Sequence, residues 1–155
     1  MLIFEKMSKE RFTYPSTIKS VNHEKMTLSI LEGAIYKINI LERAEVNLDD
    51  VKYIQKVGLE LTENKEHYVL FIAPKFGSIS NDARKYSATP EASTNVICRA
   101  IVAPNLGMRI IANFFIQYNK PAVEHKIFLK VEDALEWLSL KSNQSLGQIV
   151  AETHA

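Results

Sequence analysis

Four histidines and one cysteine are the side chains of this sequence that most often bind metals or act as nucleophiles. His23, His67, His125 and His154 are scattered, and none lies three or four residues from another, the spacing at which a helix presents two ligands to one metal ion. Cys98 lies inside an apolar run, which is typical of an inert core thiol. We therefore expect no metal site, no cofactor and no intrachain disulfide.

Two pairs of adjacent carboxylates, Asp49-Asp50 and Glu132-Asp133, are of the residue type that performs acid–base chemistry. Both pairs stand where a helix is expected to begin, and the positive end of the helix dipole explains them without catalysis. The sequence has no glycine-rich phosphate loop and no Gly-x-Ser-x-Gly turn. These observations predict a protein that is not an enzyme.

The loop of residues 75–80 is the first of two segments that could bind or respond to a ligand. It leaves a predicted buried strand and enters a predicted helix, and ligands gather at that edge of open α/β sheets. We take Lys75, Ser78 and Ser80 as a candidate regulatory or anion-binding loop, in which a serine could be phosphorylated. The simpler interpretation is that Gly77 turns the chain and Ser80 caps the helix.

The second segment is a predicted helix over residues 106–118, which is apolar around more of its circumference than a surface helix requires. Met108, Ala112 and Phe115 are the surplus, and we expect them to pack either on a neighbouring helix or on another subunit. Arg109 lies on a narrow polar stripe and could form a surface ion pair or hold a ligand. These four residues are the candidate interface of a homodimer.

Strands and helices alternate in the part of the chain that must position these residues. Alternating apolar and polar residues predict a hairpin from strands at 26–30 and 34–40. Continuous apolar runs predict buried strands at 68–73 and 95–103, and a short strand is expected at 126–129. Caps and helical spacing predict helices at about 49–65, 80–86, 106–118 and 131–138. Strands joined through helices pair in parallel, so we expect an α/β fold with a mixed sheet, an N-terminal hairpin and about four flanking helices.

Length and charge limit the classes of protein that remain. The 155 residues suffice for one domain, which we place at residues 1–140, followed by a polar C-terminal tail at 141–155. A net charge of +1 offers no basic surplus for nucleic acid, and no apolar run approaches the length of about 18 residues that a membrane span needs. The apolar N-terminal run is too short for a signal peptide, and with a single cysteine we expect a cytoplasmic protein.

Several motifs together resemble the SpoIIAA-like (STAS-like) domains of uncharacterised bacterial proteins. They are Asp82-Ala83-Arg84-Lys85-Tyr86, the strand ending Ile101-Val102-Ala103-Pro104, residues 109–115, Asn119-Lys120-Pro121, Ile127-Phe128 and residues 134–138. The resemblance covers about residues 26–139 and implies a mixed sheet with four flanking helices, no cofactor, and a role in binding or regulation. In the anti-sigma-factor antagonists that name the fold, a phosphorylatable Ser follows an Asp in the loop where this chain has Ser78 and Ser80 without that Asp-Ser pair.

The expected function is a non-enzymatic, cytoplasmic regulatory module that binds another protein and forms a homodimer. The sequence leaves the identity of the protein partner open. The alternative is a small apolar-ligand or lipid-binding protein with a cavity between the helix of residues 106–118 and the sheet.

Overall fold

One six-stranded mixed sheet forms the centre of the protein, which we describe from a computed structural model over residues 13–154, with side chains up to residue 143. The strand order is β1-β2-β3-β5-β7-β8, antiparallel from β1 to β3 and parallel from β3 to β8. The strands are β1 (Thr17–Asn22), β2 (Met26–Leu31), β3 (Ile35–Ile40), β5 (His67–Ile72), β7 (Val96–Val102) and β8 (Glu124–Phe128). Two short parallel strands, β4 (Glu45–Val46) and β6 (Ser78–Ile79), pair separately.

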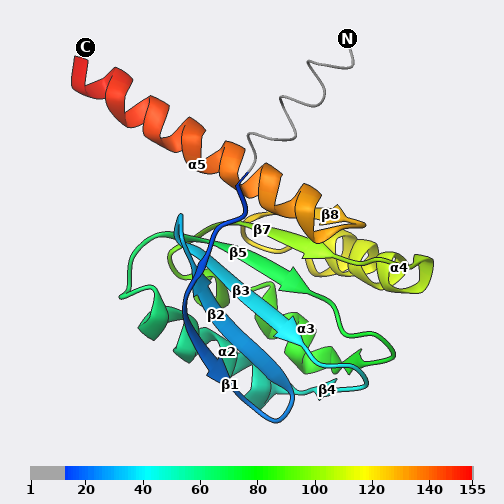
Figure 1. The fold of residues 1–155 in the computed structure, drawn as a ribbon. Helices are drawn as coiled ribbons and strands as arrows, with labels where there is room; N and C mark the ends of the chain where they lie inside the picture. The colour runs from blue at the N-terminus through cyan, green and yellow to red at the C-terminus, as the bar shows by residue number, and fades with distance from the viewer. Residues whose placement is uncertain (1–12, 155) are drawn as a thin grey trace.

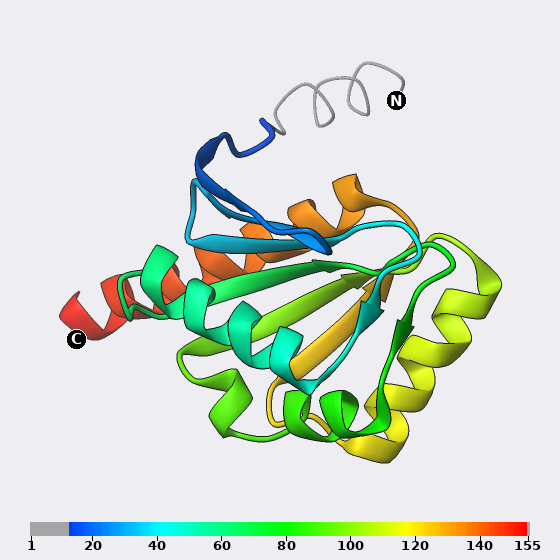
Figure 2. The same ribbon diagram turned by 90° about the horizontal axis from the view of Figure 1, so that it is seen from below.

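Helices cover both faces of the sheet. They are α2 (Leu48–Leu61), α3 (Asn81–Ser87), α4 (Leu106–Phe114) and α5 (Val131–His154). A short 3₁₀ helix, η1 (Glu91–Ser93), follows α3, and a π-helical turn, η2 (Phe115–Asn119), extends α4. Seen along the sheet, α5 lies on one side and α2, α3 and α4 lie on the other (Figure 2). After the three N-terminal strands of the sheet, strands of the sheet and helices alternate along the chain, as the colours of Figure 1 show.

The face under α5 is filled by closely packed apolar side chains. Leu70 of β5, Ala100 of β7 and Leu138 of α5 are completely buried there, and small residues let the helix approach the strands. Cys98 belongs to this core, and burial raises the pKa of its thiol to about 11. The structure therefore confirms Cys98 as a buried core residue.

On the opposite face, α2 approaches β3 very closely. The Tyr36 ring lies against Gly58, where a Cβ atom would come within 2.5 Å of the ring, so only glycine fits at this position without a shift. The Tyr36 hydroxyl donates to the carbonyl of Ile54 over 2.7 Å, and burial raises the pKa of this phenol. This contact fixes the distance between α2 and the first half of the sheet.

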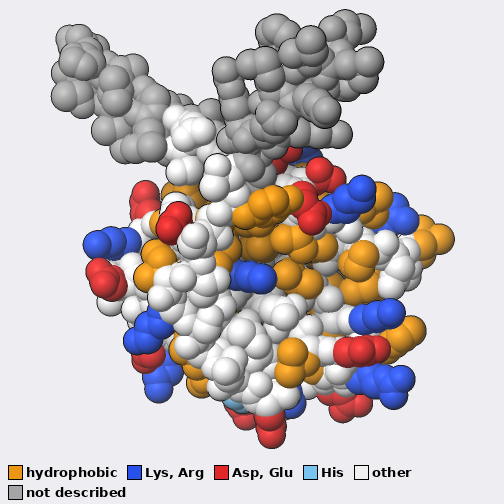
Figure 3. Space-filling view, in the orientation of Figure 1, with side chains coloured by type: hydrophobic (Ala, Val, Ile, Leu, Met, Phe, Trp, Pro, Cys, Tyr) orange, Lys and Arg blue, Asp and Glu red, His pale blue; other side chains and the backbone are white. Residues whose placement is uncertain are grey.

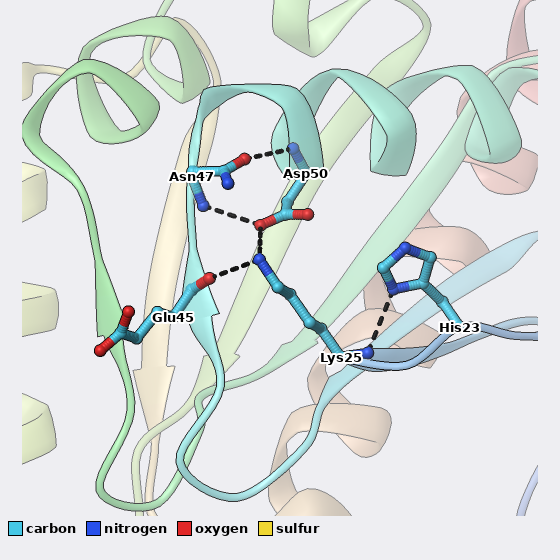
Figure 4. A network of polar contacts seen from close by, with 5 residues as sticks. All are labelled: His23, Lys25, Glu45, Asn47 and Asp50. Carbon is cyan, nitrogen blue, oxygen red and sulfur yellow. Dashed lines mark hydrogen bonds and ion pairs between the residues drawn. The ribbon is translucent and has the colours of Figure 1, made fainter.

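A polar network ties the start of α2 to the hairpin of β1 and β2 (Figure 4). Lys25 Nζ lies 2.8 Å from Asp50 Oδ2 and 2.9 Å from the carbonyl oxygen of Glu45. Asn47 and Asp50 form a reciprocal capping box, with backbone-to-side-chain hydrogen bonds of 2.9 and 3.0 Å. The Lys25 amide donates to His23 Nδ1 over 3.1 Å. Asp50 is thus a structural carboxylate, as the position of the acidic pair at a helix start predicts.

The predicted order of elements and the predicted fold class are confirmed. The sequence analysis missed β1, β4 and β6, because β1 is largely exposed and the other two strands have only two residues each. The last helix is longer than predicted, since α5 continues to His154 through the residues expected to form a polar tail. No proline stands among the additional residues to stop the helix.

The Asp50 network predicts a stability difference that depends on pH. Burial alone would raise the pKa of Asp50, but the hydrogen bonds from the Asn47 amide and the Lys25 ammonium group hold it below its ordinary value. As the pH falls below about 4, the unfolded chain takes up the proton first, so the stabilisation by the carboxylate is lost as the pH falls towards the folded-state pKa.

We expect Asp50→Asn to lower the free energy of unfolding by about 1 kcal/mol at pH 7, and the difference from the wild type to shrink below pH 4. Urea titrations at several pH values measure it. Asp49→Asn, at the exposed neighbouring position, is the matched control and should cost less. A difference for Asp50→Asn that is the same at pH 3 and pH 7 would contradict this prediction.

Candidate functional site

A cavity of about 170 Å³ lies between the sheet and the three helices α2, α3 and α4. The strands β3, β5, β7 and β8 form its floor, and it is partly open to solvent. Aliphatic and aromatic side chains make up most of the lining, among them Ile54, Val69, Phe71, Ile101, Met108 and Phe115. A concave, mostly apolar pocket with a few polar groups is the usual form of a small-molecule site.

The surplus apolar side chains of the helix at 106–118 face this cavity. Met108, Ala112 and Phe115 all line it, so they pack towards the sheet across the cavity. Arg109 is half-buried, and its Nε atom is buried without a hydrogen-bond partner. The predicted homodimer contact through these four residues stays a prediction, and the outward side chains of α4 are a different set.

A bulge in β7 brings a charged side chain to the cavity floor. Val96 pairs with His67 and Arg99 pairs with Val69, so β7 uses one residue more than β5 over the same distance. The extra residue reverses the alternation of side chains, and both Val96 and Arg99 therefore face the cavity while Cys98 faces α5. Bulges often re-aim a side chain in this way beside binding sites.

Arg99 is held by backbone carbonyls and by no carboxylate. Its Nη1 donates to the carbonyl of Ser87 over 3.1 Å and its Nη2 to that of Ala92 over 2.8 Å. Among the described residues, no Asp or Glu forms an ion pair with it or lines the cavity. Arg99 is half-buried, and the part of its surface that remains accessible borders the cavity. Burial of the rest lowers the pKa of its guanidinium to about 10.

Two histidines flank Arg99 on neighbouring strands. His125 on β8 pairs directly with Arg99, and His67 lies at the start of β5. Each Nδ1 lies against a backbone carbonyl, at 2.8 Å from Val123 for His125 and 2.9 Å from Lys65 for His67, and therefore carries the proton. Burial lowers the pKa of His125 to about 4 and also lowers that of His67, and the charge of Arg99 acts in the same direction. Both rings are therefore neutral at pH 7, with Nε2 unprotonated.

The candidate loop at Lys75, Ser78 and Ser80 lies at the other end of β5. The Ser80 hydroxyl accepts a hydrogen bond from the Ala83 amide over 3.3 Å and donates to Asp82 over 2.7 Å, so it acts as the cap of α3. Ser78 is exposed in β6, and the Lys75 ammonium group lies 5.5 Å from the centre of the Phe76 ring. The structure thus shows the capping role of Ser80, and a regulatory or anion-binding role of this loop stays a prediction.

The surface shows no concentration of one charge on the face drawn in Figure 3. Lys and Arg side chains alternate with Asp and Glu side chains there, and hydrophobic atoms reach the surface where α4 lies in Figure 1. Within residues 13–154, no helix combines the length and the hydropathy needed to cross a bilayer.

The sequence analysis missed Arg99 and considered His125 only as a metal ligand, for which its spacing from the other histidines is wrong. One signal was available, since Arg99 is the only charged residue in the run of residues 95–103, which is otherwise almost wholly apolar. A charge in the middle of a buried strand needs a reason, because an unpaired buried ion is costly. The bulge that turns Arg99 towards the cavity depends on the pairing with β5 and leaves no pattern in the sequence.

Comparisons with known proteins give a family and a similarity to solved structures. The model of the family described as "Domain of unknown function (DUF7793)" matches residues 28–141, and no curated protein matches the chain. A solved structure of an uncharacterised DUF3478-family protein with a SpoIIAA-like fold, from Shewanella loihica PV-4, is similar with 13% identity and a TM-score of 0.49. The match covers 82% of this chain and 97% of that chain.

The surroundings of His125 predict an unusually acidic imidazole. We expect its ring to titrate with a midpoint near pH 4, because the partly buried ring has lost much of its contact with water and lies beside the Arg99 charge. The pH dependence of its ring proton shifts in NMR spectra measures this midpoint. Arg99→Met, which removes the neighbouring charge, should move the midpoint upwards. A midpoint above pH 6 in the wild type would show that the His125 ring is open to water and would contradict this prediction.

Proposed function

The chain belongs to the family described as Domain of unknown function (DUF7793), and we propose that this member is a binding protein that holds a small apolar molecule between α4 and the sheet. The single observation that carries the proposal is the cavity, whose lining is mostly aliphatic and aromatic. Transfer of apolar surface from water into such a lining is favourable by about 25 cal/mol per Å².

The size of the cavity limits the ligand. An apolar cavity of about 150 Å³ in another protein takes up benzene, so a volume of about 170 Å³ fits a single ring or a short branched chain. A longer chain would have to extend through the open side. The polar side chains in the lining are mostly engaged with the protein itself. Gln55, for example, accepts a hydrogen bond from the Tyr86 hydroxyl and donates to the carbonyl of Glu91. This arrangement supports binding rather than catalysis.

A second candidate function is a contact between two copies of the chain through the outer face of α4. Leu106, Ile110, Phe114 and Tyr118 are spaced four residues apart, and all are exposed, Phe114 by 47% and Tyr118 by 71%. Such a row of side chains can interdigitate with the same row on another helix. Arg109 is the only charged residue from 105 to 119, so little charge repulsion would oppose self-association. These features support the homodimeric interaction module expected from the sequence.

The roles expected of a cytoplasmic regulatory protein fit either function. A module that binds a small molecule could pass its occupancy to a protein partner, and Lys75, Ser78 and Ser80 lie in an accessible loop where a phosphoryl group could be added. Regulation through the loop and binding of a protein partner are therefore part of the proposal.

Toluene binding tests the proposed cavity site. We expect toluene to shift the amide NMR signals of β5, β7 and α4 in the wild type, because one ring fits the cavity. Ala112→Phe, which puts a ring into the cavity from α4, should weaken binding at least about tenfold by occupying the same volume. Asn113→Phe adds the same ring at the next, exposed position of α4 and should leave binding unchanged.

Equal toluene binding by the wild type and the folded Ala112→Phe variant would contradict the proposal. A complete lack of binding by the wild type would do so as well. Native mass spectrometry of the gently purified protein adds an independent readout, because a tightly held natural ligand should appear as additional mass.

The outer face of α4 makes a separate prediction about assembly. Phe114→Glu places a charge in the exposed row and should convert a dimer into a monomer, as measured by light scattering. Gln117→Glu introduces the same charge at an exposed polar position of η2 and is the control. A wild type that is monomeric at high concentration, or a Phe114→Glu variant that stays dimeric, would exclude this interface.

A further inference from the structure

Arg99 places a positive charge on the floor of a cavity that is otherwise mostly apolar. Removing an ion from water is unfavourable unless a counter-charge and hydrogen bonds compensate for it. The carbonyls of Ser87 and Ala92 accept two of its hydrogen bonds, and no described carboxylate supplies the counter-charge. The guanidinium group carries five N–H donors, so three remain without a protein partner among the described residues.

The other polar groups of the lining do not compensate for this charge. His67 and His125 are neutral and present unprotonated Nε2 atoms, and Arg84 is a second cation, which donates to the carbonyl of Ile79 over 2.7 Å. The lining thus combines apolar walls with two arginines and no acidic side chain. A molecule that complements it has an apolar body and an anionic end.

We propose that the natural ligand is a small apolar carboxylate, an aromatic acid or a short-chain acid, whose carboxylate is bound by Arg99. This inference rests on the proposed function, since it names the chemical class of the cavity ligand. A planar guanidinium matches a carboxylate with two parallel hydrogen bonds, which gives both affinity and orientation. The two carbonyl contacts hold the guanidinium group in one position before the ligand arrives, so little side-chain entropy is lost on binding.

The apolar walls set the other half of the specificity. Val69 and Ile101 flank Arg99 on the floor, and Met108, Ala112 and Phe115 face them from α4. A ring or short chain attached to the carboxylate would contact these side chains, whereas a free phosphate or sulfate ion would leave them uncovered. The arrangement therefore favours an amphiphilic anion over an inorganic one.

The experiment compares phenylacetate with phenylacetamide, which has nearly the same shape and no charge. We expect isothermal titration calorimetry to show phenylacetate bound at least about tenfold more tightly by the wild type at pH 7. Arg99→Met should remove this preference while toluene binding persists, and Arg99→Lys should retain part of it. Arg84→Met should keep the preference, because the proposal assigns the carboxylate to Arg99. Inorganic phosphate should not compete with phenylacetate.

The outcomes separate the two proposals. Equal affinity for both compounds, with toluene bound, would overturn the carboxylate assignment and leave the apolar site intact. If toluene, phenylacetate and phenylacetamide all fail to bind, both the carboxylate assignment and the proposed function are overturned. A preference lost in Arg84→Met and kept in Arg99→Met would overturn the role of Arg99. If Arg99→Met does not fold, the comparison of the two compounds on the wild type and on Arg99→Lys still decides.

Discussion

The close contact between Tyr36 and Gly58 determines how the helical layer lies on the sheet. This contact places α2 close to β3. A helix about 10 Å wide covers only about two strands, because neighbouring strands lie about 4.8 Å apart. The other parallel strands on that face are covered by α3, η1 and α4, and the cavity lies between these helices, α2 and the sheet. On the opposite face, small residues such as Ala100 and Ala134 let α5 pack directly on the strands. The cavity thus lies on the face that several short helices share, and not on the face that one long helix covers.

The polar part of the cavity depends on a local irregularity in that sheet. A regular β7 would send Val96 and Arg99 to opposite faces, and the guanidinium group would then either leave the cavity or enter the packed core under α5. The bulge avoids this, and the C-terminal end of α3 provides the Ser87 carbonyl that orients Arg99. A buried cation contributes little to stability by itself. The position of Arg99 on the cavity floor is easier to understand as a requirement of binding than as a requirement of folding.

The sequence predicts those features that depend on periodicity and caps. The hairpin at β2 and β3, the buried strands β5 and β7, and the starts of α2, α3 and α4 all follow from alternation, apolar runs and residues such as Asn47 and Ser80. The excess of apolar residues on α4 was also visible. The sequence does not show whether these residues face a neighbouring helix, another subunit or a cavity, because that depends on how far α4 lies from the sheet. Arg99 and His125 are 26 positions apart in the chain, and only the parallel register of β7 and β8 makes them neighbours.

The helix α4 is involved in both proposed functions, with separate sets of side chains. Met108, Ala112 and Phe115 face the cavity, whereas Leu106, Ile110 and Phe114 lie on the exposed face. A ligand and a second copy of the chain would therefore contact the same helix without competing for the same atoms. Ile111 both lines the cavity and is exposed, whereas Met108 and Phe114 each belong to one set, so substitutions at these two residues can change one function at a time. If both functions are present, a shift of α4 on ligand binding would alter the exposed row as well, which is the simplest physical route from occupancy of the cavity to a protein partner.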